Sequence, residues 1–205
     1  YQGQIRCRNF FRERLFFLSN DCSMKSLFEY PGFRILAVFL KEPYREFYLR
    51  EVASHTKVSV STVKAYLDSL VSDEFLLRSK RANLALFKAN IENPAFKYFK
   101  IAYFLRHLRP LIRHLKRKYE KSSIILYGSC ARGEDDKDSD IDLLIIGGAE
   151  KIELTDFERK FNRTITLLVY GYQDWEEKAR QDKAFYESTI TDGLVVQGNL
   201  PVIKK

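Results

Sequence analysis

The sequence has few residues of the kinds that build disulfide frameworks and zinc centres. Its three cysteines, Cys7, Cys22 and Cys130, form neither an even set nor a metal-ligand spacing, which excludes a cysteine-rich scaffold. His107 and His114 lie seven residues apart without a third ligand, so we interpret them as helix surface rather than a metal site. Scattered thiols of this kind favour a reducing environment, and we expect a cytoplasmic protein of prokaryotic type.

Long apolar runs are also absent. The longest, such as residues 35–40, are far shorter than the ~20 residues needed to cross a bilayer, so no membrane association is expected. No internal repeat or low-complexity segment is present. The 16 Phe and 12 Tyr among 205 residues are ample for a packed core, and this length suits one large or two small domains.

Charge is distributed unevenly along the chain, whose formal net charge is +8. Residues 1–122 contain 24 Lys and Arg against 11 Asp and Glu, a balance of +13. Residues 123–205 contain 11 against 16, a balance of −5. A basic half followed by an acidic half indicates two domains, of which the first meets a polyanion and the second handles a metal ion.

Residues 1–23 do not follow the pattern of the rest. The only methionine is Met24, and it reads as a natural start. We interpret residues 1–23 as an extension that is foreign to the native protein, with a genuine N-terminal helix as the alternative. The charged residues at 12–14 interrupt anything resembling a signal-peptide core.

The next segment, residues 24–93, shows helical spacing first and strand-like runs afterwards. Ser59 or Ser61 can cap a helix that begins near residue 59. We expect helices at 33–41, 47–56 and 59–70, and strands at 75–78 and 85–88 joined by a basic tip at 79–83. This order over residues 31–90 resembles a winged helix-turn-helix.

The resemblance implies DNA binding, with the third helix in the major groove and the strand tip on the phosphates. A dimerisation or protein-docking role is the alternative, and a homodimer is the default expectation. The residues expected to face DNA are Ser61, Thr62, Lys64, Arg78, Lys80 and Arg81.

Residues 94–121 form an expected linker helix that Pro110 kinks or divides. Basic residues, Lys97 and Lys100 among them, occupy the positions outside the apolar face, so a nucleic-acid surface is an alternative to a helix that merely packs on both domains. The apolar face is expected to comprise Phe96, Phe99, Tyr103, Leu108, Leu111, Ile112 and Leu115.

The most informative motif lies in residues 122–205. Gly128 and Ser129 follow the apolar run 124–127, and Asp140 and Asp142 precede the apolar run 143–146. Because side chains alternate along a strand, the two carboxylates point to the same side. They suit Mg²⁺ (or Mn²⁺) carrying substrate phosphates, while the glycine turn and the hydroxyl suit a triphosphate.

Neighbouring residues have lesser expected roles. Arg132, on the helix after the turn, can add a charged contact to phosphate. Cys130 is expected to be a packed small residue rather than a nucleophile. Asp135, Asp136 and Asp138 are interpreted as solvated loop charge.

This motif, Tyr-Gly-Ser-x-Ala-Arg-Gly followed by Ser-Asp-Ile-Asp-Leu-Leu, resembles the minimal nucleotidyltransferases of the DNA polymerase β-like superfamily. The resemblance implies a small domain with a mixed sheet and metal-dependent nucleotidyl transfer from ATP or another nucleoside triphosphate. It also implies a protein or nucleic-acid acceptor, because some members are antitoxins that adenylylate a HEPN toxin.

One position departs from the family pattern. The third carboxylate of the family's site falls on Thr166, with Thr164 beside it on the expected strand 163–170, and no acidic residue lies between Arg163 and Gln173. Nucleotide binding can survive this change, whereas transfer chemistry is weakened, since a hydroxyl does not replace an anionic ligand.

The sequence thus predicts an α+β or mixed α/β chain: a winged helix at 24–93, a linker helix at 94–121 and a nucleotidyltransferase domain at 122–205. Within the last, residues 174–191 are expected to be helical and 193–198 to form a short strand or edge segment. The favoured function is Mg²⁺-dependent nucleotidyl transfer, adenylyl from ATP to a protein or nucleic-acid acceptor, by an enzyme that the winged helix places on DNA, with an antitoxin-like role. The alternative is a DNA-binding regulator whose transferase domain is impaired by Thr166, and a further one is an antitoxin that occludes its toxin without chemistry.

Overall fold

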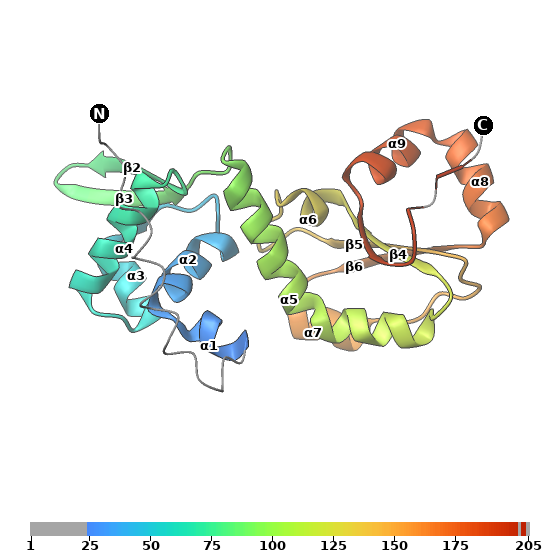
Figure 1. Ribbon diagram of the computed structural model, residues 1–205, viewed down its shortest axis with the longest axis horizontal. Coiled ribbons are helices and arrows are strands. Elements are labelled where there is room, and N and C mark those ends of the chain that lie inside the picture. Colours follow the sequence, from blue (N-terminus) through green and yellow to red (C-terminus); the bar gives the residue numbers. More distant parts are fainter. Residues whose placement is uncertain (1–23, 201, 204–205) are drawn as a thin grey trace, which may run out of the picture.

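The computed structural model describes residues 24–200 and 202–203; the predicted extension at 1–23 lies outside the described residues. Figure 1 shows a helical part with a small sheet on one side and a larger sheet with its own helices on the other. A long helix, α5 (Pro94–Lys118), runs from the first part into the second. The functional residues predicted from the sequence are therefore divided between two separate packing units.

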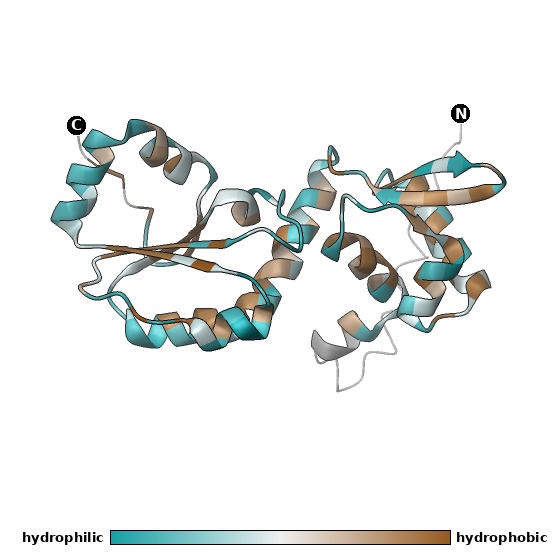
Figure 2. Ribbon diagram, turned by 180° about the vertical axis from the view of Figure 1, so that it is seen from behind, coloured by the Kyte–Doolittle hydropathy of each residue, from teal (hydrophilic) through white to brown (hydrophobic). Residues whose placement is uncertain are grey.

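The first unit consists of short helices around a three-stranded antiparallel sheet whose order is β1-β3-β2. Its inner faces are mostly brown in Figure 2, and they enclose a core that includes Phe39, Phe47, Val63, Leu67 and Phe96. Its elements are α1 (Met24–Glu29), α2 (Pro31–Lys41), β1 (Phe47–Tyr48), α3 (Leu49–Thr56), α4 (Val60–Ser72), β2 (Leu76–Arg81) and β3 (Leu84–Ala89).

Local chemistry explains where α3 and α4 begin and end. Lys57 adopts a left-handed conformation that ends α3, and the Ser59 hydroxyl accepts a hydrogen bond from the Thr62 backbone N–H at 3.2 Å. Of the two predicted caps, Ser59 is therefore the one that is used. The predicted helix 47–56 begins two residues late, because Phe47 is fully buried and pairs with Phe87 of β3 as a short strand.

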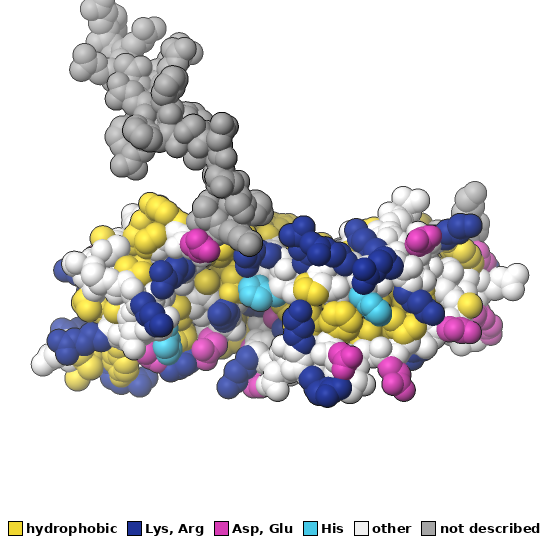
Figure 3. All heavy atoms as spheres, turned by 90° about the horizontal axis from the view of Figure 1, so that it is seen from below, with side chains coloured by type: hydrophobic (Ala, Val, Ile, Leu, Met, Phe, Trp, Pro, Cys, Tyr) yellow, Lys and Arg dark blue, Asp and Glu magenta, His cyan; other side chains and the backbone are white. Residues whose placement is uncertain are grey.

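Helix α5 is continuous, so of the two predicted effects Pro110 does not divide it; a kink is the effect that fits, because the ribbon changes direction along its length in Figure 1. Asn93 precedes the helix and caps it, because its side chain accepts hydrogen bonds from the backbone N–H groups of Ala95 and Phe96. Two positions differ from the predicted faces: Phe99 is 48% exposed, and Lys100 is buried. Most of the other basic residues are exposed, and Figure 3 shows Lys and Arg side chains gathered along the middle of the molecule.

The second unit is built on a four-stranded sheet of order β6-β5-β4-β7, in which β5 and β6 are parallel and the other pairs antiparallel. The predicted mixed sheet is thereby confirmed. Its strands are β4 (Ser123–Tyr127), β5 (Ile141–Ile146), β6 (Ile165–Tyr170) and β7 (Leu194–Gln197), and its helices are α6 (Gly128–Arg132), α7 (Thr155–Phe161), α8 (Tyr172–Gln181) and α9 (Lys183–Asp192).

One predicted helix of this unit is in fact two. The helix expected at residues 174–191 is divided into α8 and α9 at Asp182. The Asp182 carboxylate accepts a hydrogen bond from the Phe185 backbone N–H at 3.1 Å, so it caps the start of α9. A capping residue inside an apparently continuous helical pattern therefore marks the break.

Helices cover both faces of the larger sheet, as Figure 1 shows. Alternate strand residues such as Ile124, Leu143 and Leu167 pack toward α5 and α7, whereas Ile125 and Leu144 pack toward Trp175 of α8. Asp142 has the parity of Leu144 and so lies on the side of α8 and α9. Within the residues that the structure describes, no helix has the length and apolarity needed to cross a membrane.

Candidate functional site

The Gly-Ser turn connects strand β4 to the short helix α6. Gly128 has a φ of +72°, a conformation that L side chains rarely adopt. A Cβ atom at this position would overlap the carboxylate oxygen Oδ2 of Asp142. Glycine is therefore required here for two reasons, the backbone conformation and the close approach of the Asp142 carboxylate.

The two motif carboxylates lie at the start of strand β5. Asp142 is half-buried inside the strand, opposite Tyr127 of β4, whereas Asp140 is exposed and precedes the strand. Burial raises the pKa of Asp142, and the negative charge of Asp140 raises it further. The two carboxylates are thus close enough to repel each other, and a divalent cation between them would relieve this repulsion.

Thr166 of β6 lies directly beside Asp142 in the parallel register of β5 and β6. Thr166, which the sequence comparison with the family pattern predicts to stand in place of a third carboxylate, is therefore next to Asp142 in the sheet. Across the described part of the chain, no group of three or more His, Cys, Asp or Glu could hold a metal ion. The donors that fit Mg²⁺ are the two carboxylates, and the other ligands would come from water and from substrate phosphate oxygens, as is usual for this ion.

Ser129 and Arg132 follow the glycine on α6. Ser129 is half-buried one residue after Gly128. The Arg132 guanidinium is 2.8 Å from Glu134 and 4.0 Å from Asp192, and its hydrogen bond to Glu134 is the main cause of its raised pKa. Arg132 is consequently charged and close to Asp142, but a phosphate would compete with Glu134 for it.

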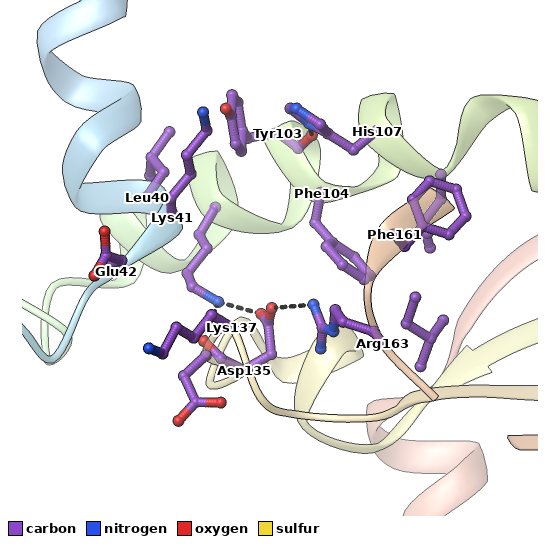
Figure 4. A pocket seen from close by; sticks show the side chains of 14 residues that line it. Leu40, Lys41, Glu42, Tyr103, Phe104, His107, Asp135, Lys137, Phe161 and Arg163 are labelled. Atoms are coloured by element: carbon purple, nitrogen blue, oxygen red, sulfur yellow. Dashed lines mark hydrogen bonds and ion pairs between the residues drawn. The ribbon is translucent and has the colours of Figure 1, made fainter. Parts of the chain in front are cut away.

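The loop between the glycine turn and Asp140 contains a buried ion cluster, drawn in Figure 4. Asp135 contacts Lys100 of α5 and, at 3.1 Å, the guanidinium of Arg163. The side chains are 7%, 2% and 10% exposed, respectively. The interpretation of Asp135 as solvated loop charge is therefore wrong, because two cations from distant elements surround it, and Lys100 is not an outer-face residue of α5.

The electrostatics of this cluster follow from burial. Burial lowers the pKa of Lys100, and the negative charge of Asp135 opposes that change. Cys130, which lies in the same region, is fully buried, and burial raises the pKa of its thiol to about 12. Cys130 is thus a packed, protonated residue, as predicted, and not a nucleophile.

Arg163 is the residue of this region that sequence reasoning missed. Its guanidinium donates hydrogen bonds to the backbone carbonyls of Ser139 and Asp140 and to the sulfur of Cys130. The Phe104 ring lies 5.0 Å from the guanidinium carbon. No local pattern around position 163 predicts these contacts, because each partner is at least 23 residues away in the sequence.

A cavity of about 360 Å³ lies behind the motif, between α2, α5 and the loop that contains Asp135. Aromatic side chains of Tyr103, Phe104 and Phe161 form much of its wall, and Arg163 lies at its base. Neither Asp140 nor Asp142 lines this cavity. Asp142 has the parity of Leu144, which packs toward α8, so it faces the side of the sheet away from this cavity.

The residues predicted to contact DNA lie in the first packing unit, on α4 and β2, and the structure does not bring them to the carboxylate pair. Ser61, Lys64 and Lys80 are exposed, and Thr62 is half-buried against the Ser59 hydroxyl. The other two are exposed but paired: Arg78 is 3.6 Å from Asp68, and Arg81 is 3.1 Å from Glu46.

Among the comparisons with known proteins, a match to a family model bears on this part of the chain. A search of curated proteins found no match. A crystal structure of human N-acetylserotonin methyltransferase in complex with SAM is similar over 36% of this chain, at 18% identity and a TM-score of 0.25, which is too low to carry an argument. The matched part is about a quarter of that methyltransferase chain. Residues 108–188 match the family model described as "Nucleotidyltransferase domain", which supports a nucleotidyltransferase fold and a transferase activity for this part of the chain.

Proposed function

We propose that the C-terminal unit transfers a nucleotidyl group, adenylyl from ATP in the first instance, with Mg²⁺ or Mn²⁺ held by Asp140 and Asp142. The observation that carries the proposal is the packing of Gly128 against the Asp142 carboxylate, with the charge of Asp140 close by. A side-chain-free turn beside paired carboxylates lets a triphosphate approach the backbone and a cation at once.

Each motif residue has a distinct role in this proposal. Asp140 and Asp142 hold the cation, Gly128 and Ser129 bind the outer phosphates, and Arg132 adds a charged contact. The bound cation would neutralise phosphate charge. In the transfer itself, the acceptor oxygen or nitrogen forms a bond to the α-phosphorus and loses its proton to solvent, while the bond to pyrophosphate breaks and pyrophosphate leaves.

DNA binding belongs to the first packing unit in this proposal. Three helices, α2, α3 and α4, followed by the β2–β3 hairpin give the element order of a winged helix. Helix α4 presents Ser61 and Lys64 to solvent. The hairpin presents Lys80, which forms no ion pair with any residue that the structure describes, unlike Arg78 and Arg81. Such cations would contact phosphates, and the exposed face of α4 would enter the major groove.

Thr166 favours a second candidate function. A hydroxyl beside Asp142 supplies no negative charge, and a missing carboxylate weakens the site for a second cation. On this view the chain is a DNA-binding regulator whose transferase domain binds nucleotide or a partner protein without transferring anything.

A thermal-unfolding titration with ATP, with and without Mg²⁺, tests nucleotide binding. At one hundred times the dissociation constant, ATP should add about 2.7 kcal/mol to the free energy of unfolding, or roughly 5–10 °C in Tm. The double variant Asp140→Asn/Asp142→Asn should lose this shift. Asp138→Asn is the matched control, since Asp138 is an exposed carboxylate of the same loop, and it should keep the shift. If wild type shows no Mg²⁺-dependent shift, the transferase proposal is contradicted, and of the second candidate only the regulator that binds a partner protein is left.

Transfer is tested separately with ATP labelled at the α-phosphate and an extract that supplies protein and nucleic-acid acceptors. Label transferred by wild type supports the enzyme, and it should disappear in the double variant. Label transferred only by Thr166→Asp supports the impaired regulator, because the missing charge is then the defect. No transfer by either protein, with ATP bound by both, contradicts the transferase proposal.

A further inference from the structure

Arg163 bridges the backbone of the segment that delivers the first motif carboxylate. The residue lies just before β6, and its Nε and Nη2 atoms donate to the carbonyl oxygens of Ser139 and Asp140, the second at 3.3 Å. A planar guanidinium that holds two consecutive carbonyls fixes both the position and the orientation of that backbone segment. The next residue, Ile141, begins strand β5, so the same contact sets how Asp142 enters the strand.

The guanidinium is itself held from several directions. Asp135 accepts a hydrogen bond from Nη1 at 3.1 Å, Cys130 Sγ accepts one from Nη2 at 3.1 Å, and the Phe104 ring packs near it. Asp135 in turn contacts the ammonium group of Lys100, whose side chain is 2% exposed. With its own side chain only 10% exposed, Arg163 has little freedom to leave this position.

We propose that Arg163 is a positioning residue for the carboxylate pair: it holds the Ser139–Asp140 backbone and thereby sets the separation and direction of the Asp140 and Asp142 carboxylates toward a divalent cation. This inference rests on the proposed nucleotide site. Arg163 hydrogen-bonds the backbone of Asp140 but not that of Asp142, so it acts through the Asp140 segment and not on the substrate.

The positioning contact is tied to the linker helix. Lys100 and Phe104, one helical turn apart on α5, orient the carboxylate and the guanidinium of the cluster. On the other side of the loop, Tyr44, from the segment between α2 and β1, donates a hydrogen bond to the Glu134 carbonyl at 2.7 Å. The segment that carries Asp140 is therefore anchored to elements of both packing units.

The test compares the Mn²⁺ affinity of wild type with that of Arg163→Lys in the presence of ATP, using electron paramagnetic resonance to count free Mn²⁺ and subtracting the Mn²⁺ that ATP binds in a protein-free sample. Lysine keeps the positive charge but cannot hold two carbonyls and a carboxylate at fixed angles. Replacing a residue that orients metal ligands typically weakens metal affinity 10–100-fold, so we expect Arg163→Lys to bind Mn²⁺ about tenfold more weakly. The control is Arg159→Lys, because Arg159 is 75% exposed and pairs with Asp156 on the surface of α7.

The outcomes separate this inference from the proposed function. If wild type binds no Mn²⁺ with ATP, the nucleotide site is wrong and the inference falls with it. If wild type and Arg163→Lys bind Mn²⁺ equally, the inference alone is overturned. A merely structural role would lower Tm without changing Mn²⁺ affinity at a temperature where both proteins are folded. Should Arg163→Lys fail to fold, Phe104→Leu leaves the arginine in place but loosens it, and unchanged Mn²⁺ affinity in that variant overturns the inference as well.

Discussion

Replacing Asp135 by asparagine is the perturbation that most directly tests how the two packing units are held together. The Asp135 carboxylate is shared by Lys100 from the linker helix and Arg163 from the start of β6, and all three side chains are at least 90% buried. Asparagine preserves the volume of the side chain and removes its charge. Two cations would then remain buried without the carboxylate that neutralises them.

The magnitude follows from the burial of the cluster. Breaking a buried ion pair by removing one partner costs about 3–5 kcal/mol, because the remaining charge is left uncompensated. For a chain of this length, each kcal/mol lowers Tm by about 2–4 °C, so Asp135→Asn should lower Tm by roughly 6–20 °C. Lys100→Met should lower the free energy of unfolding by less, about 1–2 kcal/mol. Asp135 would still pair with Arg163, and the protein would no longer bury the charge of Lys100, which burial disfavours.

Urea unfolding followed by tryptophan fluorescence measures these differences. Trp175, the only tryptophan of the chain, is 2% exposed in α8 and reports on the unit that contains the cluster. Asp156→Asn is the matched control, since Asp156 is 90% exposed and its pair with Arg159 should contribute less than about 1 kcal/mol. The reasoning is refuted if Asp135→Asn costs no more than Asp156→Asn, or if Lys100→Met costs as much as Asp135→Asn.

Three further predictions concern the glycine turn, the carboxylate pair and the DNA-binding surface. Gly128→Ala should lower the free energy of unfolding by about 1–2 kcal/mol, because of the positive φ, and should abolish the Tm increase that ATP causes. Gly198→Ala is the control: with a φ of +76° it should also lower the free energy of unfolding, but the Tm increase with ATP should remain. Because the pKa of Asp142 is raised in the folded protein, the native state holds the extra proton just above pH 3.8, and wild type loses stability as pH rises through the raised pKa. In metal-free urea unfolding, the stability of Asp142→Asn relative to wild type should therefore grow from pH 4 to pH 7, and a constant difference would contradict the sign. Lys80→Ala should reduce the slope of log binding constant against log salt concentration for DNA, measured by fluorescence anisotropy, by about one, which corresponds to one phosphate contact. Lys151→Ala, which replaces an exposed lysine outside the first packing unit, should leave the slope unchanged.

Local sequence patterns were sufficient to predict the strands and the turn that flank the candidate site. The apolar run at 124–127 predicts β4, the run at 143–146 predicts most of β5, and the glycine between them predicts the turn, because each depends on residues that are neighbours in the sequence. The same holds for Ser59, whose hydroxyl caps α4 three residues away. The two-residue strand β1 could not be predicted in this way, since Phe47 is extended only because Phe87, 40 residues later, pairs with it.

The ion cluster shows a different limit. Lys100 and Asp135 are charged residues that are 35 positions apart, and composition favours solvent for each of them taken alone. One signal was available: Lys100 stands four residues after Phe96 and eight before Leu108, which are both buried, so helical spacing places it on the apolar face of α5. Its partner Arg163 offers no such signal, because the fold alone brings the start of β6 to the loop before β5.

Thr166 connects the stability of the site with its chemistry. It lies beside Asp142 in register, so a carboxylate at this position would adjoin the pair. A third carboxylate would add repulsion to a pair in which Asp140 already raises the pKa of Asp142, and without a cation that repulsion would destabilise the fold. With a cation and a triphosphate bound, the same charge would instead be neutralised. Thr166→Asp should therefore lower the stability of the metal-free protein and increase the stabilisation that Mg²⁺ and ATP provide. If it lowered both, the carboxylate at this position could not complete the cation site, and the regulator would become the better interpretation of the domain.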